Sequence, residues 1–189
     1  EKALPLLQQA IELHYEIGDA SSVASLDSQN QFALTLINVG DYEKAEALLN
    51  ELVVQAERVS EEPSLTVNVW NNLGLALDGV GKSTLAEQAF LKSAEIGKRS
   101  LKASHPDRYL PINNLGFFYY HEQKYELAER YLNEAWRGSQ AVNGESNPRT
   151  LISLNNYAMV LNGNGKYQEA KPLLEKAKEI SLRENGAEH

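Results

Sequence analysis

Hydrophobic and small residues recur along this chain at intervals of three and four, which is the spacing of one face of an α-helix. Ala128, Leu132 and Ala135 form one such set, with mostly polar or charged residues between them. The same spacing returns in Ala170, Leu174 and Ala177, and in Ala3, Leu7 and Ala10. The pattern therefore predicts a series of amphipathic helices, each with a narrow apolar stripe.

The helical pattern is itself repeated. The segment 113–116, Asn-Asn-Leu-Gly, has close copies 42 residues earlier, at 71–74, and 42 residues later, at 155–158, with a weaker copy at 30–33. A second marker keeps the same period: Ala3, Ala45, Ala86, Ala128 and Ala170 follow one another at 42, 41, 42 and 42 residues. Self-similarity at one period of this length indicates a repeat array, in which each repeat packs on its neighbours.

Glycine and proline divide each period into two helices. Gly40, Gly81 and Gly165 stand where glycine would supply the left-handed turn that ends a helix, whereas the third repeat has Gln123 there. Prolines mark the start of the next repeat, because proline disfavours helix at the preceding residue and fits a first helical turn. These are Pro63, Pro106 and Pro148; Pro111, Pro5 and Pro172 also stand early in their helices.

These signals predict an all-α fold of about four helix pairs that follow one N-terminal helix, from Glu1 to about Ile17. The first helices of the pairs are predicted near Ser22–Val39, Leu65–Val80, Asp107–Glu122 and Arg149–Gly163. The second helices are predicted near Tyr42–Val59, Thr84–Ser100, Tyr125–Ala141 and Tyr167–Glu184.

We expect one array over residues 1–189, made of a half repeat at 1–19 and full repeats at 20–61, 62–104, 105–146 and 147–189. The chain starts in phase with a second helix. At its other end, His189 stands 42 residues after Asn147, which precedes a proline that opens a repeat. Arrays normally end in polar capping elements, and none is evident, so we expect a fragment with more chain on both sides.

The composition of the chain limits the kinds of function that it can have. No apolar run approaches the about 18 residues that a membrane span needs. The absence of cysteine excludes disulfides and thiolate chemistry and fits a reducing compartment, so we expect a cytoplasmic protein. The net charge of −8 argues against direct nucleic-acid binding, which requires a basic surface.

The repeat resembles the tetratricopeptide repeat, with paired antiparallel helices, small residues at helix contacts and a Tyr-x-x-Ala turn. That repeat has a period of about 34 residues, and the longer period here suggests one extra turn in each helix. His105-Pro106-Asp107 followed by Asn113-Asn114-Leu115 resembles the kinesin-light-chain type, as does Asn147-Pro148 with Asn155-Asn156-Tyr157. The resemblance implies a right-handed α-α superhelix whose first helices line a concave groove.

The first helices carry one face of asparagines and apolar side chains that would look into such a groove. The asparagines are Asn30, Asn71, Asn113 and Asn155, and the apolar row is Leu34, Leu75, Phe117 and Met159. Asp78, Tyr120, His121 and Asn162 complete the candidate peptide-binding set. An asparagine amide can donate and accept at once, as a peptide bond does, and the apolar row could take alternate side chains.

The asparagines have a structural alternative. One asparagine of each pair could bond to the neighbouring first helix and keep the stack in register. We expect a division of roles, in which Asn72, Asn114 and Asn156 are structural and the asparagine before each of them faces the groove.

The sequence predicts no catalytic, cofactor or metal site, and hence no enzyme. The histidines lack the spacing of metal ligands, and Gly163-Asn164-Gly165-Lys166 stands between two helices rather than after the strand that a phosphate loop follows. The leading hypothesis is a scaffold that binds a protein or peptide in the groove. Two alternative functions stay open: a ligand-responsive regulatory arm of a larger signalling or transcription-regulating protein, and a cargo adaptor. The sequence does not give the oligomeric state.

Overall fold

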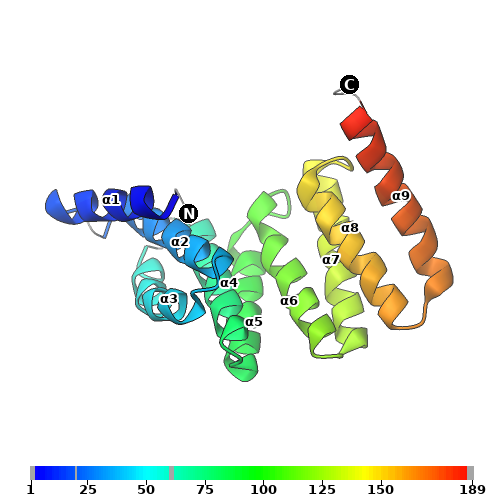
Figure 1. Cartoon of the computed structure of the whole chain (residues 1–189), viewed down its shortest axis with the longest axis horizontal. Coiled ribbons are helices and arrows are strands. Elements are labelled where there is room, and N and C mark those ends of the chain that lie inside the picture. The colour runs from blue at the N-terminus through cyan, green and yellow to red at the C-terminus, as the bar shows by residue number, and fades with distance from the viewer. Residues whose placement is uncertain (1–2, 20, 60–61, 187–189) are drawn as a thin grey trace. The chain divides into compact units, whose positions relative to one another are not determined.

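The computed structural model describes residues 3–19, 21–59 and 62–186, and these residues form helices joined by short turns (Figure 1). In this part of the chain there are nine α-helices and one 3₁₀ turn. They are α1 (Ala3–Glu16), α2 (Val23–Asn38), α3 (Tyr42–Ala56), α4 (Pro63–Gly79), α5 (Ser83–Ser100), η1 (Pro106–Arg108), α6 (Leu110–His121), α7 (Tyr125–Asn143), α8 (Pro148–Gly163) and α9 (Tyr167–Gly186). The all-α prediction is confirmed; the predicted helix start at Glu1 and the terminal His189 lie outside the described residues.

The turn inside each repeat has the left-handed residue that the sequence indicates. The φ angles of Gly40, Gly81 and Gly165 are 84°, 79° and 75°, and that of Gln123 is 59°. In the third repeat the N–H of Lys124 bonds back to the carbonyl of Tyr119 at 2.9 Å, and the other three turns close in the same way. This bond satisfies a carbonyl of the last helical turn.

We expect that Gln123→Gly stabilises the protein by about 0.5–1 kcal/mol. A side chain in the left-handed region costs about 1–2 kcal/mol, and the greater freedom of glycine in the unfolded chain offsets part of the gain. Chemical denaturation followed by circular dichroism measures the difference. The reverse change in the fourth repeat, Gly165→Gln, should destabilise by a similar amount, and a loss of stability in Gln123→Gly would contradict the prediction.

The third repeat begins differently from the second and fourth. α4 and α8 start at Pro63 and Pro148, but the predicted helix from Asp107 is wrong, because a 3₁₀ turn precedes α6. Pro111 has no N–H to donate to the carbonyl of Asp107, and its ring would crowd that oxygen, so the α-helix cannot extend back to Asp107.

The residue before each repeat-opening proline caps the turn that follows. His105 Nδ1 accepts the N–H of Asp107 at 3.2 Å, and Asn147 Oδ1 accepts the N–H of Arg149 at 2.9 Å. These two residues stand 42 positions apart, so chemically different side chains satisfy the same free helix-start N–H in successive repeats.

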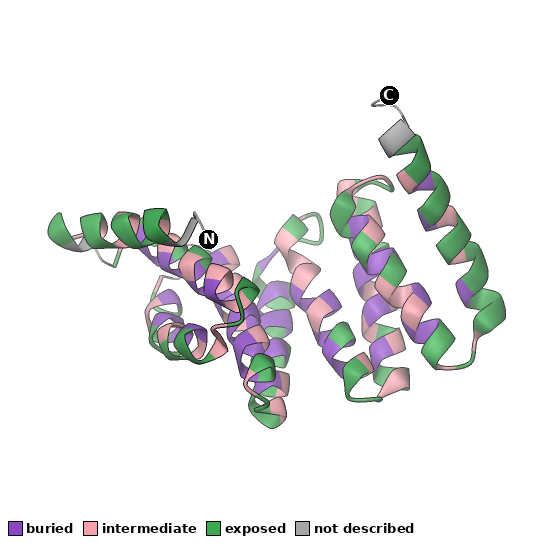
Figure 2. Cartoon of the chain, viewed as in Figure 1, coloured by how far each residue is buried: buried purple, intermediate pink, exposed green. Residues whose placement is uncertain are grey.

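The helices form two compact units, Glu1–Leu101 and Lys102–His189. Within each unit, sequential helices pack together, and buried residues line the helix sides that meet (Figure 2). Small residues permit the close approach: a Cβ added to Gly74 would lie 2.6 Å from Phe90 Cδ1, and one added to Gly116 would lie 2.7 Å from Leu132 Cγ. Ala33 and Ala158, which take this place in the other repeats, are fully buried.

Ion pairs join the second helix of one repeat to the turn of the next. Lys82 Nζ lies 2.7 Å from Glu46 Oε1, and Lys166 Nζ lies 2.6 Å from Glu129 Oε1, with Asn164 donating to the same carboxylate at 2.8 Å. Burial opposes the charged form of Glu129, but the hydrogen bonds from Lys166 and Asn164 outweigh it, so the Glu129 pKa lies below its usual range. The bond to Glu129 in turn raises the pKa of Lys166.

Candidate interaction surface

Asparagines bond from one first helix to the next. Asn72 Nδ2 on α4 donates to Asn30 Oδ1 on α2 at 2.8 Å. In the C-terminal unit, Asn156 Nδ2 on α8 donates to Asn113 Oδ1 on α6 at 3.1 Å. In both pairs the donor is the second asparagine of its segment, so the predicted structural role of Asn72 and Asn156 is confirmed.

The same bonds correct the predicted orientation of their partners. Asn30, Asn71 and Asn113 are only 2%, 2% and 6% exposed, so they do not face open solvent in a groove. The reason is geometric: Asn30 and Asn113 supply the acceptor oxygen between packed helices, and Asn71 Nδ2 donates to Asn72 Oδ1 at 3.3 Å. Of the four asparagines assigned to the groove, Asn155 is exposed.

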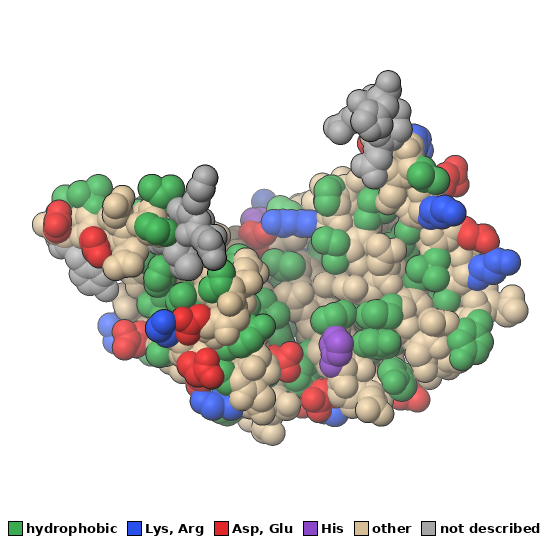
Figure 3. Space-filling model, in the orientation of Figure 1, with side chains coloured by type: hydrophobic (Ala, Val, Ile, Leu, Met, Phe, Trp, Pro, Cys, Tyr) green, Lys and Arg blue, Asp and Glu red, His purple; other side chains and the backbone are tan. Residues whose placement is uncertain are grey.

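The exposed face of α6 is aromatic. Phe117 is 38% exposed, and its ring meets that of His121, also exposed, edge to face with the centroids 4.4 Å apart. Tyr120 is half-buried, with its ring 5.6 Å from His121 and 5.7 Å from Tyr125. Figure 3 shows hydrophobic side chains and a histidine gathered near the end of α6. Three of the predicted contact residues therefore lie together.

α8 packs beside α6 and adds apolar and amide groups. Asn155 and Asn162 are exposed and Met159 is half-buried. Sequence reasoning missed Ile152, which is 55% exposed. Its position, three residues before Asn155 and seven before Met159, places it on the same helix face and could have identified it. We call Phe117, His121, Ile152, Asn155 and Met159 the C-terminal surface.

The equivalent face of the N-terminal unit is less open. Leu34 on α2 and Leu75 on α4 are half-buried, and Asp78 is exposed. α2 packs directly against α4. The four residues of the predicted apolar row thus fall into two pairs, one in each unit.

The helix turns offer no phosphate or metal site in the part of the chain that the structure describes. Gly165 and Lys166 form the left-handed turn between α8 and α9, and Lys166 is engaged by Glu129. No group of three or more His, Cys, Asp or Glu among the described residues is placed to hold a metal ion. None of the described helices has both the length and the apolar character that a membrane crossing needs.

The sequence matches the tetratricopeptide repeat family over residues 22–99 and 109–189, most of the chain. The chain belongs to the tetratricopeptide repeat family. Proteins of this family generally act as protein-interaction scaffolds. No curated protein sequence matches this tetratricopeptide repeat chain.

Solved structures with low sequence identity share the fold of this tetratricopeptide repeat protein. A candidate kinesin light chain of Podosopora anserina, with nearly identical TPR-like repeats, is 23% identical with a TM-score of 0.71, over 96% of this chain and 87% of that one. BtubC (BKLC) from P. vanneervenii is 20% identical with a TM-score of 0.67, over 98% and 92%. The apo form of RapI is 17% identical with a TM-score of 0.77, over 95% and 66%. The likeness to the kinesin-light-chain type of repeat is confirmed.

Proposed function

We propose that this tetratricopeptide repeat protein is a non-enzymatic scaffold that binds a peptide segment of another protein on the C-terminal surface. The observation that carries the proposal is the exposure of Phe117 and Ile152 on the adjacent helices α6 and α8. Large apolar side chains on an open face leave apolar area in water, and such patches commonly mark interaction sites. The aromatic ring is also the kind of group that anchors interfaces.

The polar groups of the C-terminal surface suit an extended peptide. The exposed amide of Asn155 can donate to a peptide carbonyl and accept from a peptide N–H. The His121 ring, held against Phe117, offers a further polar contact beside the apolar one. Apolar side chains of the ligand would lie over Phe117, Ile152 and Met159. We retain a cytoplasmic location as part of this proposal, since a chain without cysteine suits a reducing compartment.

A random-sequence peptide library displayed on phage, selected on the purified chain, supplies ligands for the test. For peptides that bind the C-terminal surface, we expect Phe117→Ser with Ile152→Ser to weaken affinity by about 10- to 30-fold, as loss of interface anchors does. Fluorescence anisotropy of the labelled peptides measures this.

Leu182→Ser on α9 is the matched control, because Leu182 is an exposed apolar residue outside the C-terminal surface. It should leave the affinity unchanged. If every selected peptide binds the Phe117→Ser/Ile152→Ser variant as tightly as the parent chain, while circular dichroism shows the helices intact, the proposed surface is wrong.

A further inference from the structure

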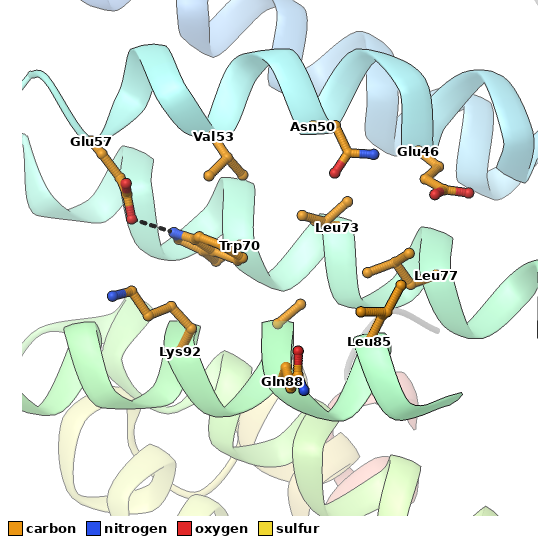
Figure 4. A pocket seen from close by; sticks show the side chains of 11 residues that line it. Glu46, Asn50, Val53, Glu57, Trp70, Leu73, Leu77, Leu85, Gln88 and Lys92 are labelled. Atoms are coloured by element: carbon orange, nitrogen blue, oxygen red, sulfur yellow. Dashed lines mark hydrogen bonds between the residues drawn. The ribbon is translucent and has the colours of Figure 1, made fainter. Parts of the chain in front are cut away.

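The N-terminal unit has an open cleft of about 530 Å³ between α3 and α5, with α4 as its floor. Figure 4 shows its walls: Glu46, Asn50 and Val53 lie along α3, Glu57 directly follows α3, and Leu85, Gln88 and Lys92 lie along α5. The floor consists of Trp70, Leu73 and Leu77. The cleft therefore combines an apolar base with polar side chains at its rim, the arrangement of a ligand site.

This cleft is separate from the face of α4 that carries Leu75. A helix turns about 100° per residue, so Leu75 points about 200° away from Leu73, toward the other side of α4. Ligands of the cleft and ligands of the first-helix face would accordingly contact different residues.

The repeated sequence provides an internal comparison for this cleft. Val53 on α3 corresponds to Trp136 on α7, 83 positions later, and Ala89 on α5 corresponds to Leu173 on α9, 84 positions later. In the C-terminal unit the Trp136 indole is buried, stacks on the Tyr157 ring with centroids 5.5 Å apart, and packs with Leu154, Leu173 and Ala177. An indole thus occupies the place where the N-terminal unit has an open cleft between small residues.

At one position of this comparison the N-terminal unit, not the C-terminal unit, carries the tryptophan. Trp70 stands where the C-terminal unit has Leu154, but its indole N–H donates to Glu57 Oε1 at 3.2 Å. That bond holds the Trp70 ring at one end of the cleft, next to Glu57 (Figure 4). Leu73 and Leu77, which are 4% and 5% exposed, form the apolar floor beside it.

The polar side chains at the rim of the cleft indicate which polar groups of a ligand accompany its apolar side chain. Among the described residues, the side chains of Asn50, Gln88 and Lys92 have no hydrogen bond or ion pair. Asn50 lies on the α3 wall and Gln88 on the α5 wall, so their amides can bond to the backbone of a bound segment. The Lys92 ammonium is a complementary partner for a carboxylate on the ligand.

The C-terminal unit fills this place with an indole, and the N-terminal cleft has, among the described residues, unbonded polar side chains at its rim. We infer that the cleft binds a peptide segment of another protein that inserts a tryptophan and carries an acidic residue nearby. The inserted indole lies over Leu73 and Leu77, between Val53 and Ala89, as Trp136 lies on Tyr157. The acidic side chain pairs with Lys92. This second site belongs to the N-terminal unit and does not depend on the C-terminal surface.

The test uses two displayed peptide libraries with random flanks, one around a fixed tryptophan and one around a fixed alanine. Selection on the purified chain should enrich binders from the tryptophan library, with Asp or Glu in the flanks. Added unlabelled, these peptides should shift the indole N–H signal of Trp70 in the ¹H–¹⁵N spectrum of the labelled protein. Lys92→Gln should weaken them about threefold or more, as expected for an interface ion pair at a rim.

Filling the cleft by Val53→Trp with Ala89→Leu reproduces the C-terminal residues and should weaken binding at least tenfold, with an unchanged or raised unfolding midpoint. Ala89→Leu alone provides a milder version of the same test. Val54→Trp is the matched control, because Val54 is exposed on α3 and does not line the cleft. The inference is overturned if no tryptophan-dependent peptide is enriched, or if the filled variant binds as the parent does. It is also overturned if N-acetyltryptophanamide binds as tightly as the peptides, which would indicate a small-molecule site.

Discussion

Replacing Gly74 with alanine is expected to destabilise the N-terminal unit by up to about 2 kcal/mol, although alanine is the better helix former. A Cβ at this position would lie 2.6, 2.7 and 2.9 Å from three ring atoms of Phe90. Phe90 is buried and cannot turn its ring into solvent. Overpacking of this kind costs about 1–3 kcal/mol, and subtracting the gain of about 1 kcal/mol in helix propensity leaves a net loss of up to about 2 kcal/mol.

The first repeat supplies the control for this prediction. There, Ala33 and Leu49 take the places of Gly74 and Phe90, and both are fully buried. Phe90→Leu should therefore make room for the new methyl group, and Gly74→Ala should then change the free energy of unfolding by less than about 0.5 kcal/mol. Urea titrations of the parent, both single variants and the double variant measure the coupling. Equal effects of Gly74→Ala in both backgrounds would contradict the proposed clash.

Asn72→Ala is expected to cost about 2–3 kcal/mol of unfolding free energy. The change removes the donor to Asn30 Oδ1, a group that is buried between α2 and α4, and the acceptor of Asn71 Nδ2. A buried polar atom left without its partner costs about 1–3 kcal/mol, because folding still removes it from water. Thermal and urea unfolding measure the loss.

Two comparisons sharpen the Asn72 prediction. Asn156→Ala should cost less, because Asn156 is partly exposed and water can replace it as donor to Asn113. Asn30→Ala combined with Asn72→Ala should cost about 1 kcal/mol less than the sum of the single changes, since the double variant leaves neither partner stranded. Strict additivity would show that the hydrogen bond contributes nothing.

The helices and turns could be predicted from local sequence, because their causes are local. Gly40, Gly81 and Gly165 each end a helix through their own backbone freedom, and even Gln123 adopts the expected conformation when the following N–H bonds back. The start of α6 could not be placed correctly, since Pro106 and Pro111 both suit a helix start and the sequence does not state which one the α-helix uses.

The candidate surface was harder to predict because it depends on contacts between helices. Helical spacing places Asn71, Leu75 and Asp78 on one face, yet Asn71 is buried and Asp78 exposed. Periodicity gives the direction of a side chain from its own axis, but burial also depends on where the neighbouring helix lies. Ile152 was missed for the same reason, since its exposure follows from the packing of α8 on its neighbours rather than from a motif.

The hydrogen bonds between asparagines have a direction. In each observed pair, the later repeat donates through its second asparagine and the earlier repeat accepts through its first. Asn30 and Asn113 each carry the acceptor for the repeat that follows, and Asn72 and Asn156 each carry the donor for the repeat that precedes. The direction is the same in both units, so a gene duplication that copies one such pair of repeats copies a donor together with its acceptor. A stack that grows by whole pairs keeps these bonds without any compensating change at these positions.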